Sequence, residues 1–348
     1  MNQLIHSVVM LRSIRFSLSL ASTAALALAS SLPLAIRPAA AEEPKAETTE
    51  AADLGVMGIS LKDAIQPNFG FQGALQGAGT PNQAGIGGFL PLVTSDNSVF
   101  FLDAQANANF ADYNNYSSII NTTVAGTTIS TSSRLGYRWL NGDRSWMFGV
   151  NAGYDSRPMA AGPTDNGVPV TNSQTVFFQQ VAASLEAVSN TWNFNAYALV
   201  PVGDVDKILN SSYGGGSLYT YGLDAGYSIT PQLNVGLGSY YQSGDCGCVN
   251  DFGVRGRIAY SLTNGVSIGA NLSYDPSFET RVSGDIKYRF GGNGYGAPSI
   301  RSQQPVVIPA IQALSTTPAN RDVRVHDYRG ALSLIFKTGF KLLGTLIK

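Results

Sequence analysis

The feature that most constrains this chain is an alternation of apolar and polar side chains that recurs between residues 68 and 290. In residues 146–155, one face carries Trp, Phe, Val, Ala and Tyr, while the other carries Met, Gly, Asn, Gly and Asp. Residues 266–274 and 281–290 show the same two faces. Successive side chains point to opposite sides in a β-strand, so each run predicts a strand with one apolar face.

Turn residues divide the alternating region into twelve such runs of roughly ten residues each, the pattern that is typical of transmembrane β-barrels. The predicted strands lie near 68–79, 84–94, 98–110, 131–140, 145–155, 175–189, 191–202, 216–229, 232–242, 251–262, 265–275 and 279–290.

The connections between these runs fall into two classes that alternate along most of the chain. Tight turns stand near 95–97, 141–143, 189–190, 230–231 and 263–265, and longer polar segments near 111–130, 156–174, 203–215 and 243–250. Bacterial barrels have short periplasmic turns and longer external loops. The pattern therefore predicts that the N-terminus and the end of the twelfth strand both face the periplasm.

Composition supports a membrane barrel over other classes. Charged residues make up 13% of the chain and the mean hydropathy is +0.03. A soluble domain carries about twice that share of charge, and a membrane protein of helices needs long apolar runs. We expect an all-β fold, a transmembrane antiparallel β-barrel of about twelve strands at residues 68–290, in the bacterial outer membrane. Its expected partners are outer-membrane lipid and the barrel assembly machinery.

The N-terminal region predicts export. Arg12 and Arg15 precede the apolar stretch 16–36, and three alanines at 39–41 offer a cleavage site. We expect residues 1–41 to be a signal peptide; a retained membrane helix is the alternative. After cleavage the net charge is −4, from 19 Lys and Arg against 23 Asp and Glu, which disfavours a nucleic-acid partner. The acidic residues 42–67 predict a periplasmic leader that contacts a periplasmic partner.

The inward faces of the predicted strands carry many charges. A twelve-stranded lumen lies between the filled interior of eight strands and the aqueous channel of sixteen. These charges either pair across the wall as structural ladders or line a cationic path for an anion or a polar segment. The predicted lumen-facing polar residues are Arg134, Arg138, Asn151, Asp155, Arg255, Arg257, Arg281, Asp285, Lys287 and Arg289.

Residues 134–155 resemble the strand–turn–strand signature of the inverse autotransporter barrels, the intimin and invasin family. Residues 84–92 are similar to that family's strand ending in Leu-Leu-Pro, and residues 192–201 to its strand ending in Tyr-x-Pro, with Leu199 at the Tyr position. Gly153 stands where the family usually has an aromatic residue. The matching motif positions are Gly136, Tyr137, Arg138, Gly149, Asn151, Tyr154 and Asp155.

This resemblance implies a chain that re-enters the lumen after the twelfth strand and carries an adhesive passenger outside. Only 58 residues follow Phe290, too few for the tandem domains of intimins. We therefore expect a display or self-plugged barrel without a recognisable passenger. The terminal strand, alternating and closing on Phe290, resembles the signal that the assembly machinery reads.

The C-terminal residues form two expected segments. Residues 291–330 are rich in Gly, Pro and polar residues, which predicts an extended linker. Residues 331–348 place apolar and basic side chains on opposite sides at helical spacing, and this helix is too short to span a bilayer. We expect it to bind a membrane surface; docking on the barrel mouth is the alternative. The residues of this helix that we expect at the membrane surface are Lys337, Phe340, Lys341 and Lys348.

Residues that would support catalysis are scarce. After export one histidine remains, His326 in the linker, and no nucleophile motif or phosphate loop is present. Cys246 and Cys248 predict a small disulfide at a loop tip, with free thiols as the alternative; a metal site is disfavoured because no other ligand lies near. We expect the protein to have no enzymatic activity and to bind no cofactor or metal. A porin-like channel for small polar solutes and a structural envelope barrel are the alternative functions.

Overall fold

The computed structural model describes residues 57–76, 81–110, 127–160, 164–165, 168–244, 249–262, 265–291 and 309–329. The predicted signal peptide, most of the leader, the two cysteines and the predicted helix at 331–348 lie outside these residues.

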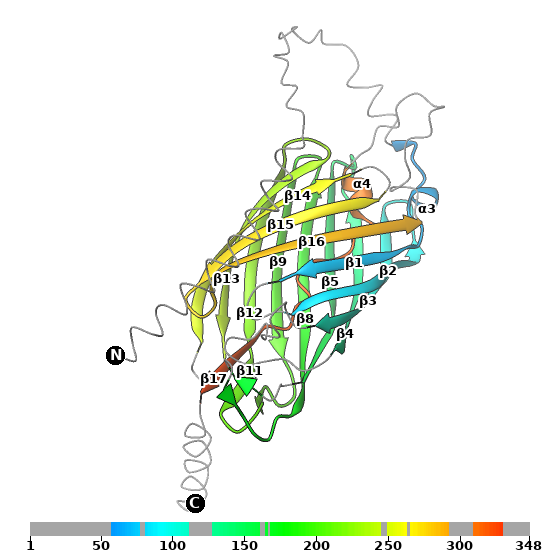
Figure 1. Ribbon diagram of the computed structural model, residues 1–348. Coiled ribbons are helices and arrows are strands. Elements are labelled where there is room, and N and C mark those ends of the chain that lie inside the picture. The colour runs from blue at the N-terminus through cyan, green and yellow to red at the C-terminus, as the bar shows by residue number, and fades with distance from the viewer. Residues whose placement is uncertain are drawn as a thin grey trace, which may run out of the picture. The chain divides into compact units, whose positions relative to one another are not determined.

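Twelve antiparallel strands close into a barrel, as the alternation predicts (Figure 1). The ring is closed by pairing of the first strand with the last, in the register Asn68↔Gly291 to Leu75↔Gly284. The all-β barrel fold is thus confirmed. In chain order the strands are β1 (Asn68–Leu75), β2 (Asn82–Thr94), β3 (Ser98–Phe110), β4 (Thr128–Leu140), β5 (Trp146–Ala160), β8 (Thr175–Ser189), β9 (Trp192–Pro201), β12 (Tyr219–Ser228), β13 (Leu233–Ser243), β14 (Asn250–Ser261), β15 (Val266–Asp275) and β16 (Glu279–Gly291).

Short elements lie at the two ends of the barrel. Helices α3 (Leu61–Ala64) and α4 (Pro309–Ala313) pack together at the end that carries the tight turns. At the other end, β10 (Asp206–Ile208), β11 (Tyr213–Ser217) and β17 (Val325–Arg329) form a small sheet, and β6 (Thr164–Asp165) pairs with β7 (Val168–Pro169). Among the described residues, no helix has the length and apolar character that a membrane crossing requires.

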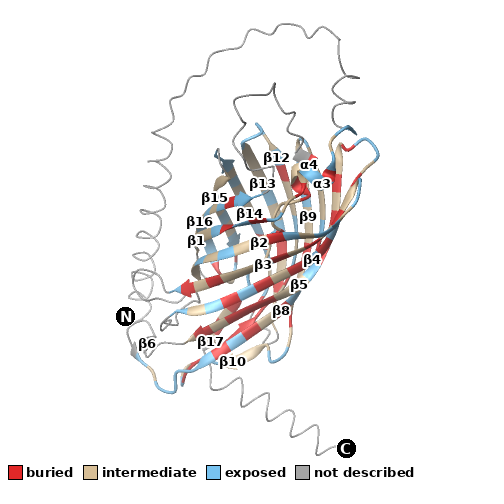
Figure 2. Cartoon of the chain, turned by 90° about the vertical axis from the view of Figure 1, so that its right-hand side faces the viewer, coloured by how far each residue is buried: buried red, intermediate tan, exposed pale blue. Residues whose placement is uncertain are grey.

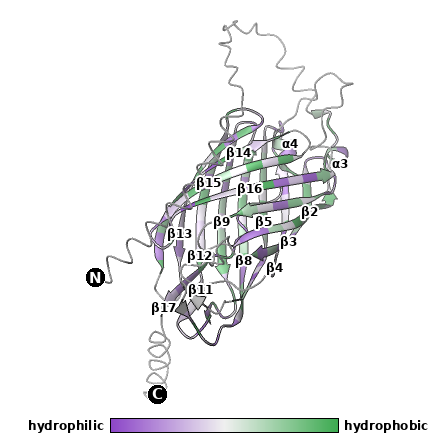
Figure 3. Ribbon diagram, in the orientation of Figure 1, coloured by the Kyte–Doolittle hydropathy of each residue, from purple (hydrophilic) through white to green (hydrophobic). Residues whose placement is uncertain are grey.

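Burial in this barrel is inverted relative to a soluble protein. On β4, the inward Arg134 and Arg138 are 1% and 0% exposed, while the outward Leu135 and Tyr137 are 47% and 43% exposed. The same alternation of buried and exposed residues runs along β3, β5 and β8 (Figure 2), and hydropathy alternates with it (Figure 3). An apolar outer surface on a closed barrel is stable only against lipid. The chain is therefore an outer-membrane β-barrel.

A continuous row of aromatic rings lies on the outer wall near the tight turns. Neighbouring ring centroids in this row are 4.9 to 6.3 Å apart. Tyr and Trp favour the level of the lipid headgroups, so the row marks one membrane interface. Because short turns face the periplasm in such barrels, we expect this row to lie at the periplasmic interface. Its members are Tyr137, Trp139, Phe148, Trp146, Phe194, Trp192 and Tyr227.

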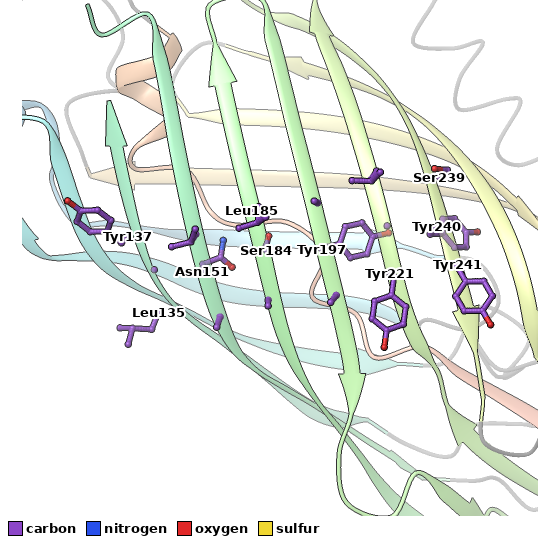
Figure 4. Close-up of a pocket in the computed structure, with 18 of the residues that line it drawn as sticks. Leu135, Tyr137, Asn151, Ser184, Leu185, Tyr197, Tyr221, Ser239, Tyr240 and Tyr241 are labelled. Atoms are coloured by element: carbon purple, nitrogen blue, oxygen red, sulfur yellow. The ribbon is translucent and has the colours of Figure 1, made fainter. Parts of the chain in front are cut away.

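A hollow on the outer wall crosses β4, β5, β8, β9 and β12 (Figure 4). The small outward residues Ala152, Ala183 and Ala196 lie in it, and larger side chains such as Tyr137 and Tyr221 border it. Its lining is mainly apolar, and its outward residues belong to the lipid-facing surface. The polar chemistry of the molecule lies on the other side of this wall, in the lumen.

Candidate functional site: the lumen and the segment that crosses it

Residues 309–329, here called the tail segment, run from the tight-turn end of the barrel to the loop end (Figure 1). The segment begins as α4 and ends as β17, and residues 317–324 between them are neither helix nor strand. A backbone without a regular partner must find other groups for its buried carbonyls and amides. The lumen wall supplies them.

At the tight-turn end the tail segment is held by apolar packing. Ala310, Ile311 and Leu314 join one buried cluster with Leu61 of α3. The remaining members of that cluster are Ala313 of α4, Ile65 that follows α3, and the barrel residues Phe89, Val99, Phe101, Leu140 and Met147. Leu314 and Ala310 are fully buried. Helix α4 therefore closes the β3–β5 side of the periplasmic mouth by the hydrophobic effect.

Arg138 bonds to both the barrel wall and the tail segment. Its guanidinium donates two hydrogen bonds to the Glu186 carboxylate, at 2.8 and 3.0 Å. It also donates to the backbone carbonyls of Leu314, at 3.2 Å, and Thr316, at 2.6 Å. The same group lies over the Phe101 ring, 4.5 Å from its centroid. Arg138 thus neutralises a buried carboxylate and satisfies two orphan carbonyls of the tail segment at once.

Two further wall arginines repeat this arrangement nearer the loop end. Arg134 forms a bidentate pair with Asp155, at 2.7 and 2.8 Å, and donates to the carbonyl of Asn320 at 3.2 Å. Arg157 donates to the carbonyl of Val323 at 2.8 Å. Side-chain guanidinium groups therefore take the place of a neighbouring strand along one edge of the tail segment.

The tail segment also sends polar side chains back to the wall. Arg321 donates to Asp103 at 2.5 Å and to the Ser132 hydroxyl at 3.1 Å. Asn320 donates to Asn195 at 3.0 Å and accepts from Arg255 at 2.8 Å. These bonds fix side chains from β3, β4, β9 and β14 around one point of the lumen, because each buried polar group needs a partner.

At the loop end the tail segment becomes part of a sheet. β17 pairs with β11 over five residues, in the register Tyr213↔Arg329 to Ser217↔Val325. Val323 and Val325 also join a buried cluster with Leu209 and Tyr213, and Met159, Val176 and Phe178 of the barrel complete it. The tail segment is thus held by an apolar cluster at each end and by charge-assisted hydrogen bonds between them.

His326 lies on β17, at the loop-end rim of the barrel. Its ring packs edge-on against Phe278, with centroids 5.4 Å apart. Burial lowers the pKa of this imidazole below its ordinary value of 6.5, while the backbone of Ser277 and the carboxylates of Asp251 and Asp275 act in the opposite direction. The docked strand therefore favours the neutral imidazole.

The predicted lumen-facing residues lie in different parts of the lumen. Arg134, Arg138 and Asp155 surround the tail segment. On the opposite wall, Arg257 pairs with Asp285 at 2.6 Å, and these side chains keep 38% and 14% of their exposure. Arg281 pairs with Asp275 at 2.9 Å near the loop end. Arg255 forms an ion pair with Asp224 and donates a hydrogen bond to Asn320. Arg289 donates to Gln72 and Thr317. The remaining predicted residues are the half-buried Lys287 and the buried Asn151.

The motif glycines make room for the arginine network. A side chain at Gly149 would come within 2.8 Å of the Arg138 side chain and 2.9 Å of Glu186. A side chain at Gly136 would come within 2.5 Å of the Phe101 ring on which Arg138 lies. Of the other motif residues, Tyr137 stacks on Trp139 and Tyr154 donates to Gln179. Asn151 is buried, with no hydrogen-bond partner in the described part of the chain.

Several important residues are absent from the predicted set. α4 lies within the stretch that was expected to be an extended linker; Pro309 at its first position is a helix-start signal that identifies it in retrospect. The alternating Val323 and Val325 similarly indicate the strand at the loop end. The other missed residues are Asp275, whose partner Arg281 is six residues away, and Gln180, Asn320, Arg321 and Arg324, whose partners are distant in sequence.

Comparisons with known proteins identify the fold. No protein-family model and no curated sequence matches the chain. A solved membrane protein described under "Unveiling the Mechanism Behind the in-meso Crystallization of Membrane Proteins" aligns with a TM-score of 0.53 and 11% identity, covering 75% of this chain and 100% of that one. KdgM porin aligns with a TM-score of 0.36 and 9% identity, covering 64% and 99%. Outer membrane phospholipase A from Escherichia coli aligns with 0.35 and 13%, covering 64% and 89%. At these identities the first likeness concerns the barrel fold alone.

Proposed function

We propose that this protein is an outer-membrane barrel of the inverse-autotransporter type, a scaffold that carries its own C-terminal chain through the lumen to the cell surface and is plugged by it. The observation that carries the proposal is the path of the tail segment. It begins beside α3 at the tight-turn end and reaches the loop end as β17, and longer loops face the outside in barrels of this type.

The bonding of the tail segment supports a permanent occupant. Four of its backbone carbonyls, those of Leu314, Thr316, Asn320 and Val323, accept hydrogen bonds from wall arginines. Those arginines are buried, and without the segment their remaining donors would face an empty lumen. The wall and the segment are therefore complementary.

The location of the C-terminus tests the proposal. An epitope tag fused after Lys348 in the full-length chain should be removed when intact cells are treated with a protease. A tag inserted at Gly142, in a tight turn at the periplasmic end, should be protected, and one inserted between β3 and β4 should be cleaved. If the C-terminal tag behaves like the Gly142 tag, the display proposal is wrong.

A channel for small polar solutes is the second candidate function. It is favoured by the wall opposite the tail segment, where the lumen-facing Asn271, Ser283, Asp285 and Lys287 stay half-buried. This wall leaves part of the lumen less tightly filled than the β3–β8 side. Steady conductance of the full-length protein in planar bilayers would favour the channel over the plugged scaffold.

A further inference from the structure

The lumen is filled unevenly by the tail segment. Lumen-facing residues on β3, β4, β5 and β8, such as Asp103, Arg134, Asp155 and Gln180, are at most 1% exposed. Their counterparts Arg257 on β14, Asn271 on β15, and Asp285 and Lys287 on β16 keep part of their accessible surface. The β14–β16 wall is therefore more accessible than these four positions on the opposite wall.

This accessible wall carries an excess of positive charge. Arg257 and Lys287 lie beside one carboxylate, that of Asp285, and Arg289 lies near Lys287; we call these four residues the basic lumen cluster. Each of the other three is an electrostatic neighbour of Lys287, and Arg321 of the tail segment adds a further cation. Asp285 accepts two hydrogen bonds from Arg257, at 2.6 and 3.0 Å, so its charge is already matched.

Lys287 is the residue that distinguishes this cluster from a structural ladder. Within the part of the chain that the structure describes, its ammonium group makes no hydrogen bond and no ion pair. Asp285 attracts this ammonium group, while the nearby arginines repel it, because like charges disfavour one another. An anion bound beside it would relieve that repulsion and accept its free donors.

The basic lumen cluster lies nearer the tight-turn end of the barrel than the loop end. Lys287 lies four residues before Gly291, the end of β16 at that mouth. Toward the outside, the same wall is blocked where Arg281 donates to Asp275 and to the Tyr240 hydroxyl, at 2.9 and 2.8 Å. A ligand of this cluster would therefore enter from the periplasm and would not pass through.

We propose that the basic lumen cluster is a binding site for oxyanions, with phosphate and carboxylate groups as its ligand class. Lys287 supplies the free ammonium donors, Arg257 the accessible guanidinium edge, and Arg289 additional positive potential from a buried position. The site is independent of whether the C-terminus reaches the cell surface.

Two sources can supply the oxyanion. Inorganic phosphate is one. The other is the chain itself, whose acidic segment at residues 42–53 contains Glu42, Glu43, Glu47, Glu50 and Asp53. Tethering would give those carboxylates a high effective concentration at a periplasmic mouth. Both sources use the same recognition chemistry.

Titration calorimetry with inorganic phosphate at low salt tests this proposal. The purified mature chain and a variant that lacks residues 42–53 are compared. Saturable binding by both proteins identifies free phosphate as the ligand. Binding only by the shortened chain identifies the acidic segment as the natural occupant. Absence of binding by both proteins would overturn the proposal.

The variant Lys287→Gln localises the site, because it removes the charge without removing a described bond. It should weaken phosphate binding about tenfold, the effect of one charge-assisted hydrogen bond. Lys207→Gln is the matched control: it removes the same charge from β10, where Lys207 pairs with Asp204 at 3.1 Å on the exposed rim. Equal binding by Lys287→Gln and the wild type, or equal loss in both variants, would refute the assignment.

Discussion

The substitution Arg138→Met should release the tail segment from the lumen. Methionine fills a similar volume but donates nothing. Glu186, 10% exposed in its side chain, would lose its cationic partner, and the carbonyls of Leu314 and Thr316 would lose their donor. Removing one partner of a buried ion pair costs about 3–5 kcal/mol. We therefore expect the ratio of docked to released tail to fall by a factor of about 10² to 10³ or more.

A second substitution separates the two contributions. In the double variant Arg138→Met with Glu186→Leu, no charge is left without a partner, so about 1–3 kcal/mol should be recovered. The two carbonyls of the tail segment still lack their donor, so docking should remain weaker than in the wild type. Lys207→Met, on the exposed rim, serves as the control for loss of a positive charge.

Trypsin cleavage after Arg321 measures the released fraction. This residue is buried in the lumen when the segment is docked, with 8% of its side chain exposed, so cleavage reports opening. Retention of the folded barrel is checked in parallel by its migration in unheated detergent gels. If Arg138→Met is cleaved as slowly as the wild type, the wall arginines do not hold the tail segment. If the double variant also matches the wild type, the carbonyl bonds contribute nothing.

Two further outcomes follow from packing and from titration. Gly149→Val should lower the free energy of unfolding by about 1–3 kcal/mol, because the new side chain would meet Arg138 at 2.8 Å. Thermal unfolding measures this loss, and Gly142→Ala, which has open space around the new side chain, should be neutral in the same measurement. Docking of β17 should weaken as the pH falls below about 6.5. The pKa of His326 is lowered in the docked strand, so protonation of the imidazole favours the undocked strand. Hydrogen exchange of the β17 amides measures this change, and His326→Phe should remove the pH dependence.

The barrel itself was predictable because every strand repeats the same local rule. β3 and β8 begin and end at the predicted residues, 98–110 and 175–189. The largest difference is at β5, which continues to Ala160, five residues beyond the predicted end. Its continuation pairs with the start of β8, Ala160 against Thr175. Pairing with a long neighbour extends a strand past the point where its own alternation fades.

The charged pairs were predictable only in part. The alternation alone predicts which side chains point into the lumen, and it places Arg134, Arg138 and Asp155 there without any information on their neighbours. Which charges meet depends on register and on strands far apart in sequence. Arg138 and Glu186 are 48 residues apart, and Arg321 and Asp103 are 218 apart. No local pattern contains that information.

The tail segment has a linker-like sequence for a physical reason. The four carbonyls that Arg134, Arg138 and Arg157 bind belong to the backbone, which every residue supplies, so this recognition places little demand on the side chains of the segment. Specific side chains are needed at the apolar clusters of the two ends, around Leu314 and Val325, and at the polar pair Asn320 and Arg321. The sequence signal of a lumen-crossing chain therefore lies in the inward arginines of the wall, and only weakly in the chain that crosses.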